Sequence, residues 1–425
     1  MINNKKVLVL GLCAFASMAL ASCGGGSQTA SADLSIWCPS TDNDVTATII
    51  EKFKAANASY ASKTIKVIAN AGEGDVYGMM SKDIEASADV VCMADDNIRS
   101  AVDGELVVAL DAATKTALTT TEGAANVASA SIDGTCYGYP YRADNSYMLF
   151  YDSTIVSDEQ AKTIEGVLAA CKTGSAKFAF SIANSWYGAS PLWAAGGNET
   201  VNSDGIIESN FATASVAAGG QAWADLYAAN HDTVWVSTDS KDTILAGFTA
   251  GATTKYGAAV LWNAYNDFHA ANANIKVTKL PTLSIGGTAK QMKAFVGTKE
   301  VVLSNKTSMT GDRLALAKAF AAYYTNSDSQ KARIALGYGP SNLTLGSSAD
   351  VAALPFIQAI GQQAAANATV SQAGQTTGKY WTPVENFGKL IVSNAPNWGD
   401  YGDGVDGCLG ALQALVKSDG WKAAA

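Results

Sequence analysis

The chain has 425 residues, of which 48% are hydrophobic and 16% are charged, and its formal net charge is −9. This acidic balance disfavours nucleic acid as a partner, and with only two histidines a histidine-rich metal site is excluded. The part that follows the N-terminal leader, about 390 residues, exceeds what one hydrophobic core usually fills, so we expect two lobes.

The N-terminus has the features of a secretory signal peptide, which we assign to residues 1–22. Lys5 and Lys6 precede an apolar run over residues 7–21. This run of about fifteen residues is shorter than the roughly 20 that a helix needs to cross a bilayer, so no permanent transmembrane span is expected. Residues 20–23 resemble the bacterial lipobox, which implies cleavage before Cys23 and attachment of lipid to its thiol. An ordinary signal peptide cleaved near Ala21 is the alternative.

Residues 23–32 are rich in Gly, Ser and Ala and show no apolar periodicity. Such a segment is typical of a flexible tether, with a reach of roughly 15–20 Å. The folded part is therefore expected to begin near Asp33.

The remaining cysteines do not form a metal-binding pattern, because no CxxC pair and no neighbouring histidine is present. They are Cys38, Cys92, Cys136, Cys171 and Cys408. Cys38 and Cys92 both end apolar strand-like runs, so a disulfide and a pair of buried thiols are both open. We expect no metal and no cofactor.

The first elements in chain order predict a parallel sheet with intervening helices. Residues 34–37, 64–69 and 88–93 have the apolar character of strands, and residues 44–56 form an amphipathic helix pattern. Strand, helix and strand at this spacing are typical of right-handed parallel crossovers. Because ligands collect beyond the carboxyl ends of such strands, the polar residues that follow the first and third strands are candidate contacts. They are Ser40, Thr41, Asp42, Asp95, Asp96 and Asn97.

Several short motifs occur in an order that carries a family resemblance over nearly the whole mature chain. The most specific is Asp133-Gly134-Thr135-Cys136-Tyr137-Gly138-Tyr139-Pro140, followed by Leu149-Phe150-Tyr151-Asp152. The other motifs lie at residues 34–37 with 65–67, 88–96 with 103–106, 185–187 with 196–197, 257–262, and 280–283 with 295–297. Together they resemble the maltodextrin-type extracellular solute-binding proteins.

The resemblance implies an α/β fold of two lobes joined by a hinge, like that of periplasmic binding proteins, with a ligand cleft between the lobes. The N-terminal lobe would comprise residues 33–141 and 281–325, and the C-terminal lobe residues 142–280 and 326–425. The chain would cross near residues 141–144, 276–281 and 325–329. A ligand that contacts both lobes only when they are closed would shift the molecule toward the closed state.

The resemblance also implies the contacts within the cleft. Sugar rings stack their C–H faces on aromatic side chains, and sugar hydroxyls need planar polar partners. The aromatic candidates are Trp186, Tyr187, Tyr265 and Trp381, all in the C-terminal lobe, whereas Trp37 and Trp262 lie inside apolar strands and are assigned to the core. The polar candidates are Thr41, Asp42, Asp95, Asp96 and Asp144.

Two departures from the family pattern limit the choice of ligand. Asn184 and Ser185 stand where maltodextrin-binding members carry an acidic residue before the aromatic, which puts maltose itself in doubt. Of the four arginines only Arg142 lies in a segment expected at the cleft, and an anionic ligand usually needs more. These features favour a neutral mono- or oligosaccharide.

The resemblance therefore predicts the carbohydrate-capturing component of an ABC importer. It would be a monomer, lipid-anchored at the outer face of the cytoplasmic membrane, that meets the transmembrane permease subunits. One alternative is a binding protein for a peptide, a polyamine or a phosphorylated polyol. The other is a secreted lipoprotein glycoside hydrolase, which would need two carboxylates at a fixed separation.

Overall fold

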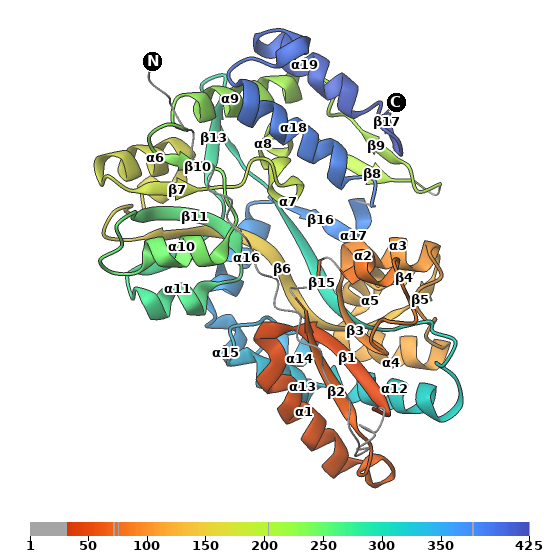
Figure 1. The fold of residues 1–425 in the computed structure, drawn as a ribbon. Coiled ribbons are helices and arrows are strands. Elements are labelled where there is room, and N and C mark those ends of the chain that lie inside the picture. Colours follow the sequence, from red (N-terminus) through yellow and green to blue (C-terminus); the bar gives the residue numbers. More distant parts are fainter. Residues whose placement is uncertain (1–31, 71–72, 75, 203, 376–377, 425) are drawn as a thin grey trace, which may run out of the picture.

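The computed structural model describes residues 32–424 apart from 71–72, 75, 203 and 376–377 (Figure 1). The predicted signal peptide, Cys23 and most of the tether lie outside the described residues. Within the described part, no helix has both the length and the apolar character that crossing a membrane requires.

A ten-stranded mixed sheet in the order β10-β7-β11-β6-β15-β3-β1-β2 runs through the molecule, with β12 joined to β6 and β16 joined to β15. The strands are β1 (Leu34–Pro39), β2 (Ile65–Asn70), β3 (Val90–Ala94), β6 (Gly138–Asp152), β7 (Lys177–Ala179), β10 (Trp235–Val236), β11 (Tyr256–Trp262), β12 (Ile275–Thr278), β15 (Ala294–Leu303) and β16 (Thr369–Ser371). As predicted, β1 pairs in parallel with both β2 and β3. Their carboxyl ends therefore share one edge.

The predicted first helix is present as α1 (Asn43–Ala56). Its buried residues are Thr46, Ile49, Ile50 and Phe53, which recur three and four positions apart and so form one face. This face packs against α12 (Gly311–Tyr324), where the Phe53 ring meets Phe320 edge to face at 5.3 Å. The local sequence pattern and the tertiary packing thus agree.

The other helices cover both ends of the sheet. Those of the first lobe are α2 (Val76–Met80), α3 (Ile98–Asp103), α4 (Ala112–Glu122), α5 (Ala124–Ser129), α13 (Ser327–Ile334) and α14 (Leu343–Gly346). Those of the second lobe are α6 (Ile164–Thr173), α7 (Ser185–Gly188), α8 (Ser190–Ala194), α9 (Ala214–Ala228), α10 (Lys241–Phe248), α11 (Tyr265–Ala271), α16 (Pro355–Ala365), α17 (Gln372–Gln375), α18 (Trp381–Asn394) and α19 (Gly404–Leu415), and α15 (Ala349–Ala352) lies between the lobes in sequence.

Small β-elements complete the two ends of the molecule. The first lobe carries the hairpin β4 (Ser131–Ile132) and β5 (Thr135–Cys136). The second lobe carries the hairpin β13 (Thr282–Ile285) and β14 (Thr288–Gln291) and a three-stranded sheet of β8 (Glu199–Val201), β9 (Ile207–Ser209) and β17 (Trp421–Ala423).

Separate hydrophobic cores divide the chain into two lobes. One core spans the second lobe, whereas two smaller clusters fill the first. Strand β6 serves both lobes, because Tyr139 and Tyr141 pack in a first-lobe cluster and Tyr147 to Tyr151 in the second-lobe core. Figure 1 shows β6 and β15 extending from one lobe into the other. The two strands pair antiparallel and form the central part of the hinge.

The observed crossings differ from the expected boundaries at two places. Strand β12 pairs with β6 inside the second lobe, and Met292 and Phe295 belong to the second core, so the chain returns to the first lobe along β15. Helix α13 still packs on α1, and the next residue in the second core is Phe356. The third crossing therefore follows α13 instead of preceding it, since α13 carries Arg333, which is buried in the first lobe.

The five cysteines within the described residues are free and buried. Cys38 Sγ accepts a weak hydrogen bond from Thr46 Oγ1 at 3.6 Å, and Cys92 Sγ lies 3.9 Å from the Tyr324 hydroxyl. Of the two possibilities for Cys38 and Cys92, the structure has the pair of buried thiols.

Candidate functional site

A cleft of about 590 Å³ lies between the two lobes. The first lobe contributes the segments that follow β1 and β3, and the second lobe contributes α7, the end of β11 and the start of α18. Strands β6 and β15 close the cleft at the hinge. This volume is in the range of small-molecule binding sites.

The first-lobe wall comes from the carboxyl ends of two parallel strands. The short 3₁₀ turns η1 (Ser40–Asp42) and η3 (Asp95–Asn97) follow β1 and β3 directly. Thr41 and Asp96 from these turns line the cleft. Burial raises the pKa of the Asp96 carboxyl to about 6, so the group is largely ionised at neutral pH and accepts hydrogen bonds.

Three tryptophans form the second-lobe wall: Trp186, Trp262 and Trp381. Trp186 is the second residue of α7, where Asn184 caps the helix by accepting a hydrogen bond from the Trp186 amide at 2.9 Å. The Trp186 ring meets the buried Tyr147 ring edge to face at 5.0 Å. Such contacts with core rings fix the orientation of an aromatic side chain.

The other two tryptophans stand at the ends of elements. Trp381 is the first residue of α18 and its ring contacts Phe295 and Tyr380, with centroids at 6.1 and 5.0 Å. Trp262 is the last residue of β11 and is 37% exposed. The three indoles therefore offer ring surface to the cleft from three different elements.

An ion network lies at the hinge side of the cleft. The Arg142 guanidinium donates two hydrogen bonds to Asp144, at 2.9 and 3.1 Å, and lies 3.5 Å over the Tyr338 ring. The Lys299 ammonium donates to Glu73 at 2.9 Å. Although burial alone would raise the pKa of Glu73, the charges of Lys299 and Arg142 lower it to about 2. Both cations are therefore neutralised by carboxylates.

Six of the eleven candidate contacts named from the sequence line this cleft. They are Ser40, Thr41, Asp96, Asp144, Trp186 and Trp381. The structure thus brings together residues from both walls and from the hinge.

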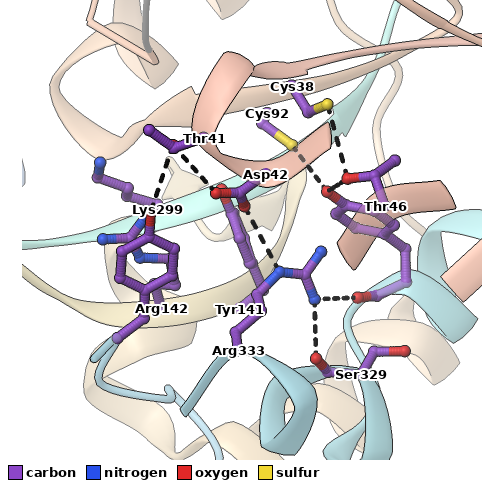
Figure 2. A network of polar contacts seen from close by, with 12 residues as sticks. Cys38, Thr41, Asp42, Thr46, Cys92, Tyr141, Arg142, Lys299, Ser329 and Arg333 are labelled. Atoms are coloured by element: carbon purple, nitrogen blue, oxygen red, sulfur yellow. Dashed lines mark hydrogen bonds and ion pairs between the residues drawn. The ribbon is translucent and has the colours of Figure 1, made fainter. Parts of the chain in front are cut away.

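Asp42 and Asp95 do not line the cleft, because each side chain turns into the first lobe. Asp42 is fully buried beneath η1 and pairs with Arg333, with Oδ2 to Nε at 3.6 Å, whereas Thr41 lies on the cleft side (Figure 2). Asp95 accepts a hydrogen bond from the backbone amide of Thr298 at 3.0 Å. These two carboxyls therefore make their contacts in the interior of the first lobe.

Tyr187 and Tyr265 are also absent from the cleft lining. Tyr187 is 2% exposed and packs on Tyr147 with ring centroids 4.8 Å apart, because successive helical residues point about 100° apart and Trp186 takes the outward direction. Tyr265 stacks on His269, one helical turn later in α11, at 5.1 Å.

Several lining residues were not among the sequence candidates. Trp262 was assigned to the core, but it is the last residue of its strand and the polar Asn263 follows it. Polar residues directly after a strand are the same signal that identified the turns after β1 and β3 as candidates. Glu73 and Lys299 are joined across 226 positions of the chain, and no local pattern indicates that pairing. Tyr338 and Gln372 also line the cleft. Their position in the fold depends on where the chain makes its third crossing between the lobes.

Comparisons with known proteins agree with this architecture. The sequence profile of the bacterial extracellular solute-binding protein family matches residues 48–359. No curated protein sequence matches the chain.

Solved structures of similar fold include one determined with acarbose, at 24% identity and a TM-score of 0.77 over 90% of this chain and 97% of that one. The maltodextrin-binding protein MalE1 of L. casei BL23 has 19% identity and a TM-score of 0.71 over 90% and 97% of the two chains. The maltose/maltodextrin-binding domain MalE of Bdellovibrio bacteriovorus, bound to maltotriose, has 16% identity and a TM-score of 0.72 over 90% and 98%. The predicted two-lobe fold is thereby confirmed, and the chain belongs to the bacterial extracellular solute-binding protein family.

Proposed function

We propose that the chain captures a neutral carbohydrate in the cleft between its lobes and delivers it unchanged to the permease of an ABC importer. The observation that carries the proposal is the cleft lining itself. Trp186, Trp262 and Trp381 lie on the second-lobe wall, and the carboxylate of Asp96 lies on the first-lobe wall. Aromatic faces suit the C–H surfaces of sugar rings, and planar polar groups suit their hydroxyls.

The charges of the cleft favour a neutral ligand. Arg142 is held by Asp144, and Lys299 is held by Glu73, so both cations that line the cleft are already paired. A phosphorylated ligand would have to compete with these buried ion pairs, which is costly because a carboxylate would be left unpaired. The side-chain amides of Asn145 and Asn263 add neutral hydrogen-bonding groups.

The structural neighbours suggest which sugars to test first. The Bdellovibrio bacteriovorus domain is bound to maltotriose, and another neighbour was determined with acarbose. Because identities of 24% and 16% establish the fold alone, we take these compounds as probes rather than as the natural ligand.

We further propose that binding closes the lobes about the hinge formed by β6 and β15, and that Cys23 anchors the protein by lipid to the outer face of the membrane. A ligand that contacts both walls binds the closed state more tightly and so increases its population. An anchored receptor would remain close to its permease.

A thermal-shift panel followed by calorimetric titration tests the proposal. Maltose, maltotriose and acarbose would be compared with spermidine, a tripeptide and glycerol 3-phosphate. A true ligand at a hundred times its Kd should add about 2.7 kcal/mol of apparent stability. Chromatography of the incubated sugar should return it intact, whereas shorter products would indicate a hydrolase. Stabilisation only by spermidine, the peptide or the phosphate would contradict a carbohydrate ligand.

A further inference from the structure

Gln372 connects the two walls of the cleft. It follows β16, which pairs in parallel with β15, and it is the first residue of α17. Its side chain is 2% exposed and lines the cleft together with Asp96 and Trp186. Helix α17 also contacts the η3 turn of the opposite lobe.

The contacts of the Gln372 amide fix its orientation. Its oxygen accepts hydrogen bonds from Trp186 Nε1 at 2.9 Å and from Asn145 Nδ2 at 3.5 Å. The Gln372 side chain also hydrogen-bonds to the Asp96 carboxylate. Because a carboxylate only accepts and an indole N–H only donates, the amide oxygen must face Trp186 and the amide nitrogen must face Asp96.

No other common side chain of this length supplies both functions. Glutamate would accept from Trp186, but when ionised it would repel Asp96. Methionine would fill a similar volume without hydrogen-bonding to either residue. The position therefore requires one acceptor and one donor on the same planar group, which are the oxygen and the nitrogen of an amide.

We propose that Gln372 is a positioning residue that holds the Trp186 indole and the Asp96 carboxylate, which belong to opposite lobes, in the mutual orientation that one sugar ring requires. This inference rests on the proposed function for the identity of the ligand, but the link between the lobes exists without ligand. Loss of Gln372 should therefore change the unliganded molecule as well as its affinity.

Ionisable groups around Asp96 must be considered in any pH experiment. Asp95 lies on the same turn, and Lys299 and Glu300 approach from β15. Wild type and variants share all of these groups. The ratio of the variant's affinity to the wild-type affinity at each pH therefore isolates the contribution of position 372.

The first test uses the unliganded mature chain carrying Cys23→Ser. The indole ¹⁵N–H resonance of Trp186, assigned through Trp186→Phe, would be followed from about pH 5 to about pH 8 in wild type, Gln372→Met and Gln372→Glu. We expect Gln372→Met to shift the resonance at every pH. In Gln372→Glu the introduced carboxyl can donate to Asp96 only while protonated, so the wild-type position should be approached in acid and lost in alkali. Gln358→Glu, an exposed position on α16, is the charge-matched control.

The second test measures maltotriose affinity of the same proteins by calorimetry. Gln372→Met should weaken binding about 10-fold at every pH, whereas Gln372→Glu should approach wild type in acid and fall at least about 10-fold below it at pH 8. Wild-type resonance and wild-type affinity in both variants at all pH values would overturn the inference. If wild type itself binds no maltotriose, this probe is not a ligand of the cleft, and the indole resonance alone decides the role of Gln372.

Discussion

Replacing Trp262 by alanine tests whether this tryptophan contacts the ligand or only packs in the core. Trp262 is 37% exposed, and for a side chain of about 250 Å² this leaves about 90 Å² for a ligand to cover. At about 25 cal/mol per Å², covering that surface stabilises the complex by about 2 kcal/mol. We therefore expect Trp262→Ala to raise the Kd for a bound sugar about 30-fold. Since β11 ends at Trp262 and the ring is already exposed, the fold should be little affected.

Calorimetric titration with maltotriose measures this effect, and circular dichroism checks the fold. Tyr401→Ala is a matched control, because Tyr401 is 43% exposed in the second lobe but is not part of the cleft lining. Trp262→Phe should give an intermediate Kd, since a smaller ring retains part of the contact. If wild type binds the sugar and Trp262→Ala binds it within twofold of the same Kd, the indole is not part of the sugar platform and the reasoning fails.

Three further predictions concern the anchor, the hinge and the buried carboxyls. Cys23→Ser should move the protein from the membrane fraction to the soluble fraction, and retention on membranes through a high-salt wash would contradict the lipid anchor. Small-angle scattering should show a smaller radius of gyration when a saturating ligand is added, and an unchanged radius would argue against closure. Burial and the neighbouring Asp96 charge raise the pKa of Asp95 from 3.8 to about 8, so the folded state keeps this proton to higher pH than the unfolded chain and stability falls as pH rises through that interval. Asp95→Asn should raise the Tm at pH 8 and make the Tm fall less steeply between pH 4 and pH 8. If the Tm of the variant fell as steeply as that of wild type, the decline would be due to other groups.

The first lobe shows how far local pattern predicts structure. The predicted strands at residues 34–37, 64–69 and 88–93 correspond to β1, β2 and β3, and the helix over 44–56 corresponds to α1 with a shift of one residue at its start. Apolar periodicity sufficed because each element buries one face or both faces against its neighbours. The rule that ligands gather beyond the carboxyl ends of parallel strands then placed Thr41 and Asp96 at the cleft.

The same rule could not distinguish neighbours within a turn. In a 3₁₀ turn successive side chains point about 120° apart, so Thr41 and Asp42 face different surroundings, as do Asp96 and Asp95. Which member of each pair faces the cleft depends on distant partners. Arg333 draws Asp42 inward from α13, and the Thr298 amide on β15 binds Asp95. Neither contact can be predicted from the sequence near the turn.

Arg142 shows why the chemistry of a cleft depends on the whole fold. Its segment was expected at the cleft, and the structure has it there, but both its hydrogen-bonding edge and its face are engaged by Asp144 and Tyr338. A guanidinium so held is a poor partner for an incoming anion and instead ties β6 to the segment that leads into the third crossing. Asp144 also accepts a hydrogen bond from the Gly339 amide at 3.1 Å. When the hinge opens, these bonds must therefore either all be kept or all be broken. The one arginine expected at the cleft thus serves the hinge, which is consistent with a receptor for a neutral sugar.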